Sequence, residues 1–211
     1  MGIIDQYDLF IFDWDGTLAE IKLMNRINER LNFLWLKKKE RSRRQALYSA
    51  RSMKRMEIRE EKETKEYKSI VDFLMLLANP KLKPDSIETM RLLRERGKRI
   101  VLFTNGAYWR VAKEAKNLGI MRYFDFLLSA QDIRYVKPNP LGLNMIIERE
   151  RARKNRVVYI GDMIDDILAA RLAHVDCAAV YSGFDTRKAL ESEKPKYMFE
   201  DMREFYEYLK K

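Results

Sequence analysis

The stretch LFIFDWDGT, residues 9–17, decides the fold. Its first four residues form a continuous apolar run, which is typical of a strand buried on both faces of a parallel sheet. Asp13 and Asp15 follow at positions i and i+2, so in an extended chain their carboxylates point the same way and repel each other unless a cation joins them. Gly16 permits a sharp turn. The stretch therefore predicts a buried strand that ends in an acidic turn suited to a cation.

The rest of the chain from residue 85 onward alternates between strand and helix patterns. Three more apolar runs are expected to be strands: residues 99–104, 156–161 and 175–181. Four helical patterns alternate with them: residues 85–97, 107–118, 140–150 and 163–173. Asp85 is expected to cap the first helix, with Glu88 three residues on, and Gly97 is expected to end it. This alternation predicts an α/β fold, a doubly wound and mostly parallel sheet with a Rossmann-like core.

Residues 20–84 do not alternate and are expected to form an inserted α-helical cap domain. They contain no Gly, and Leu23, Ile27 and Leu31 follow one another at helical spacing. The predicted domains are therefore a catalytic core, residues 1–19 and 85–211, and a helical cap, residues 20–84. The cap holds 18 basic and nine acidic residues, and the whole chain has a net charge of +10. This excess fits a solvated helix face, attraction of an anionic substrate, or nucleic-acid binding.

Polar residues follow two further predicted strands and a proline-rich loop. Thr104, Asn105 and Gly106 come directly after the strand at 99–104, and their hydroxyl and backbone N–H groups can hold phosphate oxygens. Lys137 precedes two prolines, which stiffen its backbone and allow its ammonium group to pair with a phosphate. Since parallel strands end at one edge of their sheet, these groups are expected to meet the carboxylates of residues 13 and 15 there.

The last acidic segment follows the strand at 156–161. Asp162 and Asp166 are four residues apart, hence on one face of a helix that begins there. Asp165 lies between them and is expected to point elsewhere. The sequence thus places four polar segments, far apart along the chain, at one predicted sheet edge.

In this order, these segments resemble the haloacid dehalogenase-like hydrolase superfamily, and the phosphoglycolate phosphatase-like branch in particular. The resemblance covers residues 5–19 and 85–200. It consists of DxDGT at residues 13–17, Thr104, Lys137, and GDxxxD at residues 161–166. One departure concerns the end of the following helix, where this chain has His174 and that branch usually has Gly.

The resemblance implies a Mg²⁺-dependent phosphatase that hydrolyses a small phosphomonoester. Asp13 would attack phosphorus and form an aspartyl-phosphate, and Asp15 would act as general acid and then general base. Asp13, the backbone carbonyl of Asp15, and Asp162 would hold Mg²⁺, while Asp166 would orient a water or Lys137 from behind them.

The implied phosphate-binding residues are Thr104, Asn105 and Lys137. Two other functions remain open: a phosphomutase of the β-phosphoglucomutase type, and a non-catalytic nucleic-acid-binding module with a basic cap. The acid at position 15 favours phosphoester chemistry over carbon–halogen cleavage, because dehalogenases of this family lack it. The substrate and the oligomeric state are not specified by the sequence.

Composition adds expectations about the surroundings of the protein. No apolar stretch reaches 18 residues, so no membrane-spanning helix is expected, and the first nine residues do not resemble a signal peptide. Cys177 lies in an apolar run and is expected to be an inert core residue, which fits a cytoplasmic location. Trp14 is expected to point into the core or the cap hinge, Trp109 to lie in the core, and His174 to pack or cap a helix end.

Overall fold

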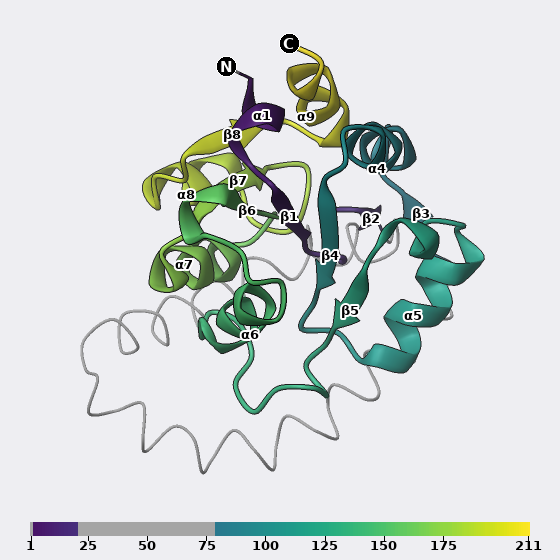
Figure 1. The fold of residues 1–211 in the computed structure, drawn as a ribbon, viewed down its shortest axis with the longest axis horizontal. Coiled ribbons are helices and arrows are strands. Elements are labelled where there is room, and N and C mark those ends of the chain that lie inside the picture. The colour runs from purple at the N-terminus through teal and green to yellow at the C-terminus, as the bar shows by residue number, and fades with distance from the viewer. Residues whose placement is uncertain (1, 21–78) are drawn as a thin grey trace. The chain divides into compact units, whose positions relative to one another are not determined.

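Six parallel strands form the central sheet in the computed structural model, which describes residues 2–20 and 79–211 (Figure 1). Their order is β5-β4-β1-β6-β7-β8. The strands are β1 (Leu9–Phe12), β4 (Arg99–Phe103), β5 (Phe126–Leu128), β6 (Val157–Gly161), β7 (Asp176–Val180) and β8 (Tyr197–Phe199). β1 lies between β4 and β6, with Phe12 opposite Leu102 and Ile160. The segments that follow these three strands therefore start side by side.

Helices cover both faces of this sheet and confirm the predicted doubly wound α/β fold. They are α1 (Ile3–Gln6), α4 (Ser86–Glu95), α5 (Tyr108–Asn117), α6 (Leu141–Arg149), α7 (Ile164–Ala173), α8 (Arg187–Ser192) and α9 (Met202–Leu209). Short 3-10 turns stand at Met121–Tyr123 and Lys154–Arg156. One hydrophobic core contains residues of α1, α4, α5 and α9, and the other contains residues of α6, α7 and α8.

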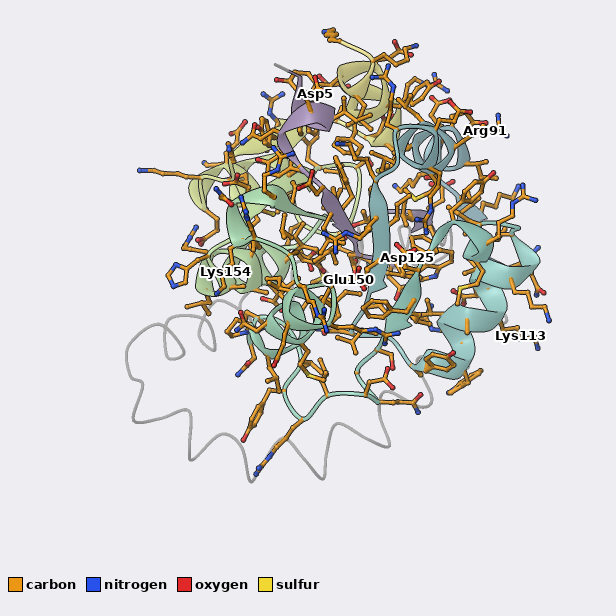
Figure 2. All side chains as sticks on the ribbon, viewed as in Figure 1. Asp5, Arg91, Lys113, Asp125, Glu150 and Lys154 are labelled. Carbon is orange, nitrogen blue, oxygen red and sulfur yellow. The ribbon has the colours of Figure 1, made fainter. Side chains whose placement is uncertain are left out.

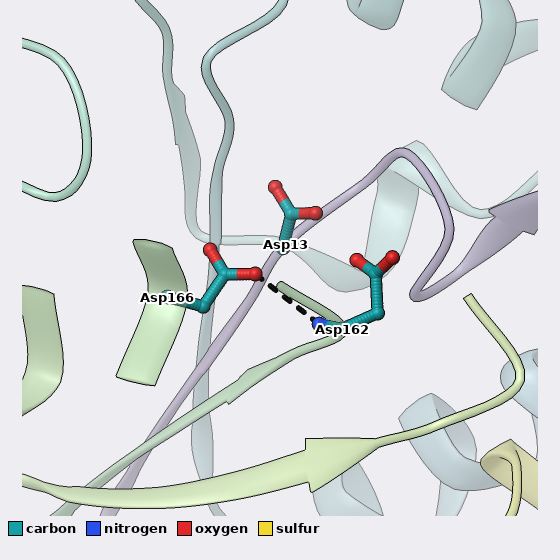
Figure 3. A group of neighbouring side chains, drawn as sticks. All are labelled: Asp13, Asp162 and Asp166. Atoms are coloured by element: carbon teal, nitrogen blue, oxygen red, sulfur yellow. Dashed lines mark hydrogen bonds between the residues drawn. The ribbon is translucent and has the colours of Figure 1, made fainter. Parts of the chain in front are cut away.

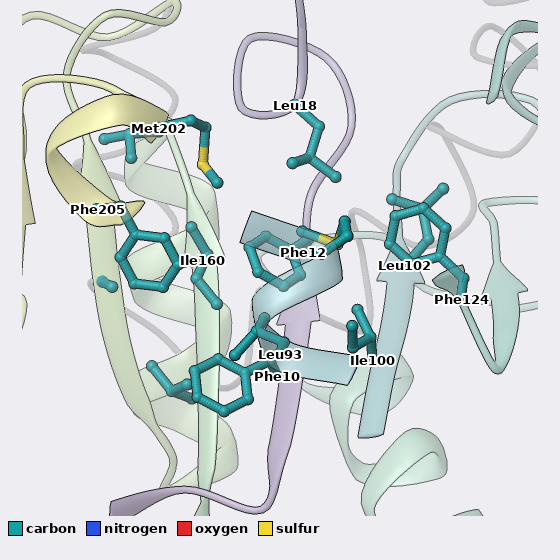
Figure 4. Packing of buried hydrophobic residues seen from close by; sticks show 14 of the residues in the cluster. Phe10, Phe12, Leu18, Leu93, Ile100, Leu102, Phe124, Ile160, Met202 and Phe205 are labelled. Atoms are coloured by element: carbon teal, nitrogen blue, oxygen red, sulfur yellow. The ribbon is translucent and has the colours of Figure 1, made fainter. Parts of the chain in front are cut away.

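Alternate residues of β1 belong to different cores, as its period of two requires. Phe10 and Phe12 face the α4 and α9 side, where Figure 4 shows them between Ile100 of β4 and Ile160 of β6. The other two residues of the strand face the opposite core, and all four are fully buried. Each such side chain contributes about 1.5–3 kcal/mol by leaving water, so this strand firmly anchors the acidic turn that follows it.

The predicted first helix of the core exists and begins after Asp85 as expected, but the Asp85 side chain does not cap it. Asp85 occupies the N-cap position with a left-handed backbone (φ 59°) and makes no side-chain capping bond. Its carboxylate instead accepts a hydrogen bond from Nε of Arg203 on α9, at 2.9 Å. A contact between distant segments has replaced the local bond that the sequence suggested.

The expectation that Trp109 lies in the core is wrong, whereas Trp14 does lie there. Trp14 is fully buried, whereas Trp109 is 41% exposed. Position 109 faces outward because Val111 and Ala115 supply the buried face of α5. Figure 2 shows Lys113 of the same helix on its outer side. Cys177 is buried in β7, as predicted.

Most of the predicted helical cap, residues 20–84, lies outside the described residues, so its helical character stays a prediction. At its two ends, β2 (Ala19–Glu20) and β3 (Lys81–Leu82) pair as short antiparallel strands. Within the described part of the chain, none of the helices combines the length and the apolar character needed to cross a membrane.

The end of α7 gives a prediction about stability. His174 is the C-cap residue with φ 59° and ψ 43°, the left-handed region in which residues other than glycine are strained by about 1–2 kcal/mol. Replacing His174 by Gly should stabilise the protein by about 0.5–1 kcal/mol, the remainder being lost to the flexibility of glycine in the unfolded chain. Chemical denaturation measures the change.

Leu172, two residues earlier, is the matched control because it is 53% exposed and lies inside the last turn of α7. Leu172→Gly should destabilise the protein by about 1 kcal/mol, since glycine is unfavourable inside a helix. If both glycine variants shift stability in the same direction, the strain at residue 174 is not the cause.

Candidate active site

Three carboxylates from two neighbouring strand ends meet at the carboxyl edge of the sheet. Asp13 follows β1, Asp162 follows β6, and Asp166 lies in the first turn of α7. All three are buried, and one oxygen of each lies within 4.8 Å of the others (Figure 3). The sequence predicted this convergence from the rule that parallel strands end at one edge.

Lys137 reaches this cluster from the loop after β5. Its Nζ donates to Asp13 Oδ1 at 2.6 Å, to Asp166 Oδ1 at 2.8 Å and to the hydroxyl oxygen of Tyr159 at 2.7 Å. Burial alone would lower the pKa of Lys137, but the two carboxylates outweigh it and raise that pKa. The lysine is therefore held as a cation between two acids.

One lysine does not neutralise three buried carboxylates. Burial raises the pKa of Asp13 to about 7, with Lys137 lowering it and Asp166 raising it. Burial and the neighbouring charges of Asp13 and Asp166 also raise the pKa of Asp162 well above its usual range. The cluster is thus short of positive charge at neutral pH, which is the situation that a bound cation relieves.

The donor set fits a hard cation such as Mg²⁺, which prefers oxygen ligands. Both oxygens of Asp166 are already engaged: Oδ1 by Lys137 and Tyr159, and Oδ2 by the backbone N–H groups of Asp162 and Met163. Since each Asp166 oxygen already accepts two hydrogen bonds, Asp166 is placed to orient its neighbours. The oxygens of Asp13 and Asp162 accept at most one hydrogen bond each from the described residues, which leaves lone pairs for a cation and makes these two the candidate ligands.

Asp162 is held toward Asp13 by its own hydrogen bonds. Its Oδ1 accepts from the Thr17 hydroxyl at 3.0 Å, and its Oδ2 accepts from the Phe184 backbone at 2.7 Å. Two glycines make room for it, because a Cβ atom at Gly16 or Gly183 would lie 2.2 Å or 2.1 Å from Oδ2. Close packing thus fixes the direction of this carboxylate.

The segment after β4 contributes a buried hydroxyl and a clamp. Thr104 is 1% exposed, and its Oγ1 accepts from the backbone N–H of Gly106 at 2.9 Å. The side-chain amide of Asn105 binds Lys137 at two points, accepting from its N–H at 3.0 Å and donating to its carbonyl at 3.2 Å. The phosphate role predicted for this segment therefore rests on the Thr104 hydroxyl and backbone N–H groups, while the Asn105 amide positions Lys137.

Asp15 lies beside the cluster rather than in it. Its carboxylate pairs with Arg110 of α5, at 2.9 Å from Nη1 to Oδ1 and 2.5 Å from Nη2 to Oδ2. The side chain of Asp15 is thus engaged by Arg110, and the metal contact expected from its backbone carbonyl stays a prediction.

Sequence reasoning missed three residues that contact this site. Tyr159 lies within an apolar run and looks like an ordinary strand residue, yet its hydroxyl accepts a hydrogen bond from Lys137 and donates one to Asp166. Arg110 and Glu114 look like an ordinary i, i+4 surface pair on a helix, yet both are buried. That spacing, directly after a predicted phosphate-binding segment, was the available signal.

Comparison with known proteins agrees with this arrangement. Residues 7–174 match the model of the haloacid dehalogenase-like hydrolase family. The chain is 27% identical over 120 residues to the phosphoglycolate phosphatase of Pseudomonas fluorescens (57% of this chain, 44% of that protein). It is 27% identical over 126 residues to that of Vibrio parahaemolyticus (60% and 55%).

The chain spans about half the length of these relatives. A solved haloacid dehalogenase-like hydrolase from Streptococcus pneumoniae has the same fold, with a TM-score of 0.67 and 19% identity over 97% of this chain and 99% of that one. The family match covers most of the core, including all the carboxylates described above. The chain therefore belongs to the haloacid dehalogenase-like hydrolase family.

Proposed function

We propose that this protein is a Mg²⁺-dependent phosphatase that hydrolyses a small phosphomonoester through an aspartyl-phosphate on Asp13. One observation carries the proposal: the Asp13 carboxylate lies at the sheet edge between Lys137 and Asp162, with a second acid two residues on. A phosphate needs positive charge and a positioned nucleophile; Lys137 together with a bound cation would supply the first, and Asp13 would supply the second. The names of the relatives support phosphate esters as the substrate class.

The reaction has two steps. First, an oxygen of Asp13 bonds to phosphorus while the bond from phosphorus to the ester oxygen breaks, and protonated Asp15 gives its proton to the departing oxygen. Second, water attacks the same phosphorus, the electron pair of the Asp13–phosphorus bond returns to the Asp13 carboxylate, and Asp15 takes the proton of the water. The products are an alcohol and inorganic phosphate, and Asp15 is again protonated.

Lys137 and Thr104 hold the oxygens of the phosphoryl group that do not react. Lys137 is fixed by the Asn105 side chain and by Asp166, and its bond to Asp13 would pass to a phosphoryl oxygen when substrate binds. Asp13, Asp162 and the Asp15 carbonyl would hold Mg²⁺. When bound, the ion supplies charge neutralisation between the anionic nucleophile and the anionic phosphate.

A panel of phosphomonoesters with Mg²⁺ tests this function. The panel contains phosphoglycolate, sugar phosphates and nucleoside monophosphates, and inorganic phosphate release is measured with Asp13→Asn as the blank. Release that depends on Asp13 supports the phosphatase. Isomerised sugar phosphate without free phosphate would indicate a mutase, and no release from any ester contradicts the proposal.

Metal binding gives a prediction that is independent of turnover. At about pH 8, Mg²⁺ added to chelator-treated protein should raise Tm by about 5–10 °C, since a ligand at 100 times its Kd stabilises by about 2.7 kcal/mol. The physical reason is that the ion offsets the burial of Asp162 and its repulsion by Asp13 and Asp166, which together raise the pKa of Asp162. Differential scanning fluorimetry measures the shift.

Asp162→Asn should lose most of this Mg²⁺-induced shift, because it removes a charged candidate ligand. Asp5→Asn is the matched control: Asp5 is an exposed residue of α1, on the far side of β1 from the acidic turn. An equal shift in both variants would place the metal elsewhere.

A further inference from the structure

A closed ring of buried contacts holds the side chain of Asp15. Arg110 donates hydrogen bonds to both carboxylate oxygens of Asp15, and its Nη1 also donates to Glu114 Oε2 at 3.0 Å. The same Oε2 accepts the indole N–H of Trp14 at 2.7 Å. Because Trp14 precedes Asp15 in the chain, the contacts return to their starting point.

The ring is rigid and mostly shielded from water. The side chains of Arg110 and Glu114 are each 1% exposed, and that of Asp15 is 18% exposed. A bidentate guanidinium–carboxylate pair fixes direction as well as distance. Asp15 is thus the least buried member, with its carboxylate fixed from behind.

The ring is also next to the phosphate-binding segment. A Cβ atom placed on Gly106 would lie 2.3 Å from Nη2 of Arg110 and 3.3 Å from Oδ2 of Asp15. Gly106 in turn donates its N–H to the Thr104 hydroxyl. The carboxylate of Asp15 therefore lies against the loop that is expected to hold the phosphoryl group.

We propose that Arg110, backed by Glu114, is a positioning residue that aims the carboxyl group of Asp15 at the water of the second step. This inference rests on the proposed function. An ionised carboxylate only accepts hydrogen bonds, and with one lone pair of each oxygen on Arg110 it keeps others for water. In this step the water oxygen bonds to phosphorus, its proton goes to Asp15, and the phosphorus–Asp13 bond breaks with its electron pair kept by Asp13.

The two steps should therefore depend on Arg110 to different degrees. With p-nitrophenyl phosphate the first step needs no proton, because p-nitrophenolate departs as an anion. The second step needs the Asp15 carboxylate whatever the substrate was. Loss of Arg110 should accordingly leave formation of the phosphoenzyme nearly unchanged and slow its hydrolysis about 100-fold, within the range for a misplaced general base.

Stopped-flow measurement of p-nitrophenol release tests this inference. Arg110→Met leaves the Glu114 charge buried and unpaired, so the double variant Arg110→Met/Glu114→Gln is made as well; its amide oxygen can still accept from Trp14. Both variants should show a burst of one p-nitrophenol per protein, then slow turnover, and intact mass should show a phosphorylated chain. Arg110→Lys keeps the positive charge but cannot bind both Asp15 oxygens in the bidentate way. Its turnover rate after the burst should lie between the rates of these variants and that of the unaltered protein.

Arg94→Met is the matched control, since Arg94 of α4 also pairs with an aspartate, Asp125, at 2.9 Å. It should change neither phase. If burst and turnover are slowed equally in the folded double variant, the positioning role of Arg110 is overturned, while the proposed function stands. No p-nitrophenol release by the unaltered protein, or release that survives Asp13→Asn, overturns the proposed function and this inference with it.

Discussion

Asp13→Asn should lower phosphate release about 10⁴-fold or more while the fold survives, a loss of the size seen when a nucleophile is removed. The amide has nearly the same shape as the carboxylate but cannot displace an alcohol from phosphorus. The Asp13 side chain is buried at the end of β1, whose four residues are fully buried, so the strand keeps its place. Phosphate release and phosphoenzyme mass are the measurements.

The same variant should melt higher than the unaltered protein when no metal is bound. Burial raises the pKa of Asp13 to about 7 from 3.8, so between these values the folded state binds a proton that the unfolded state does not. Stability from this group is therefore present below about pH 4 and is lost as the pH rises through about 7. Asn has no such loss, so its advantage should grow from acid to neutral pH.

Asp5→Asn, on the exposed side of α1, is the control for both measurements and should change neither. Full activity in Asp13→Asn would remove the nucleophile from the proposal. A melting advantage that shrank with rising pH would instead contradict the raised pKa of Asp13.

The strands that position the site, β1, β4 and β6, were predictable because each is a continuous apolar run. The edge strands β5 and β8 were not, because each has only three residues. Such a strand is too short to show a period, and neighbours on one side alone decide whether it pairs. The expectation that Trp109 lies in the core failed because it relied on residue type. The position of a residue around the helix axis decides its burial, and in α5 the buried face is the one that carries Val111 and Ala115.

Within the site, the residues whose positions are fixed by the backbone at a strand end were the predictable ones. Asp13, Thr104 and Asp162 were found because strand ends fix where they lie, and topology alone brings them together. The partners of Asp15 were not found, because a buried Arg110 and an exposed one have the same sequence pattern. Only the packing of α5 against the sheet turns that residue inward.

Lys137→Met should lower turnover about 10³-fold, as expected for loss of a fixed charge at the phosphoryl group, and should also destabilise the metal-free protein. Its ammonium group is the shared partner of Asp13 and Asp166, at 2.6 and 2.8 Å. Removing one member of a buried ion pair costs about 3–5 kcal/mol, because the remaining charge is left uncompensated. Chemical denaturation and phosphate release measure the two effects.

A second substitution separates these effects. Lys137→Met/Asp166→Asn removes one of the stranded charges, so it should recover much of the stability. The amide oxygen can accept from the backbone N–H groups of Asp162 and Met163 while the amide NH2 donates to the Tyr159 hydroxyl oxygen. Turnover should stay low, because the phosphoryl oxygens have still lost their cation. If activity instead returned together with stability, Lys137 would be a structural counter-charge for the acids, and the charge that stabilises the reacting phosphoryl group would have to come from another residue.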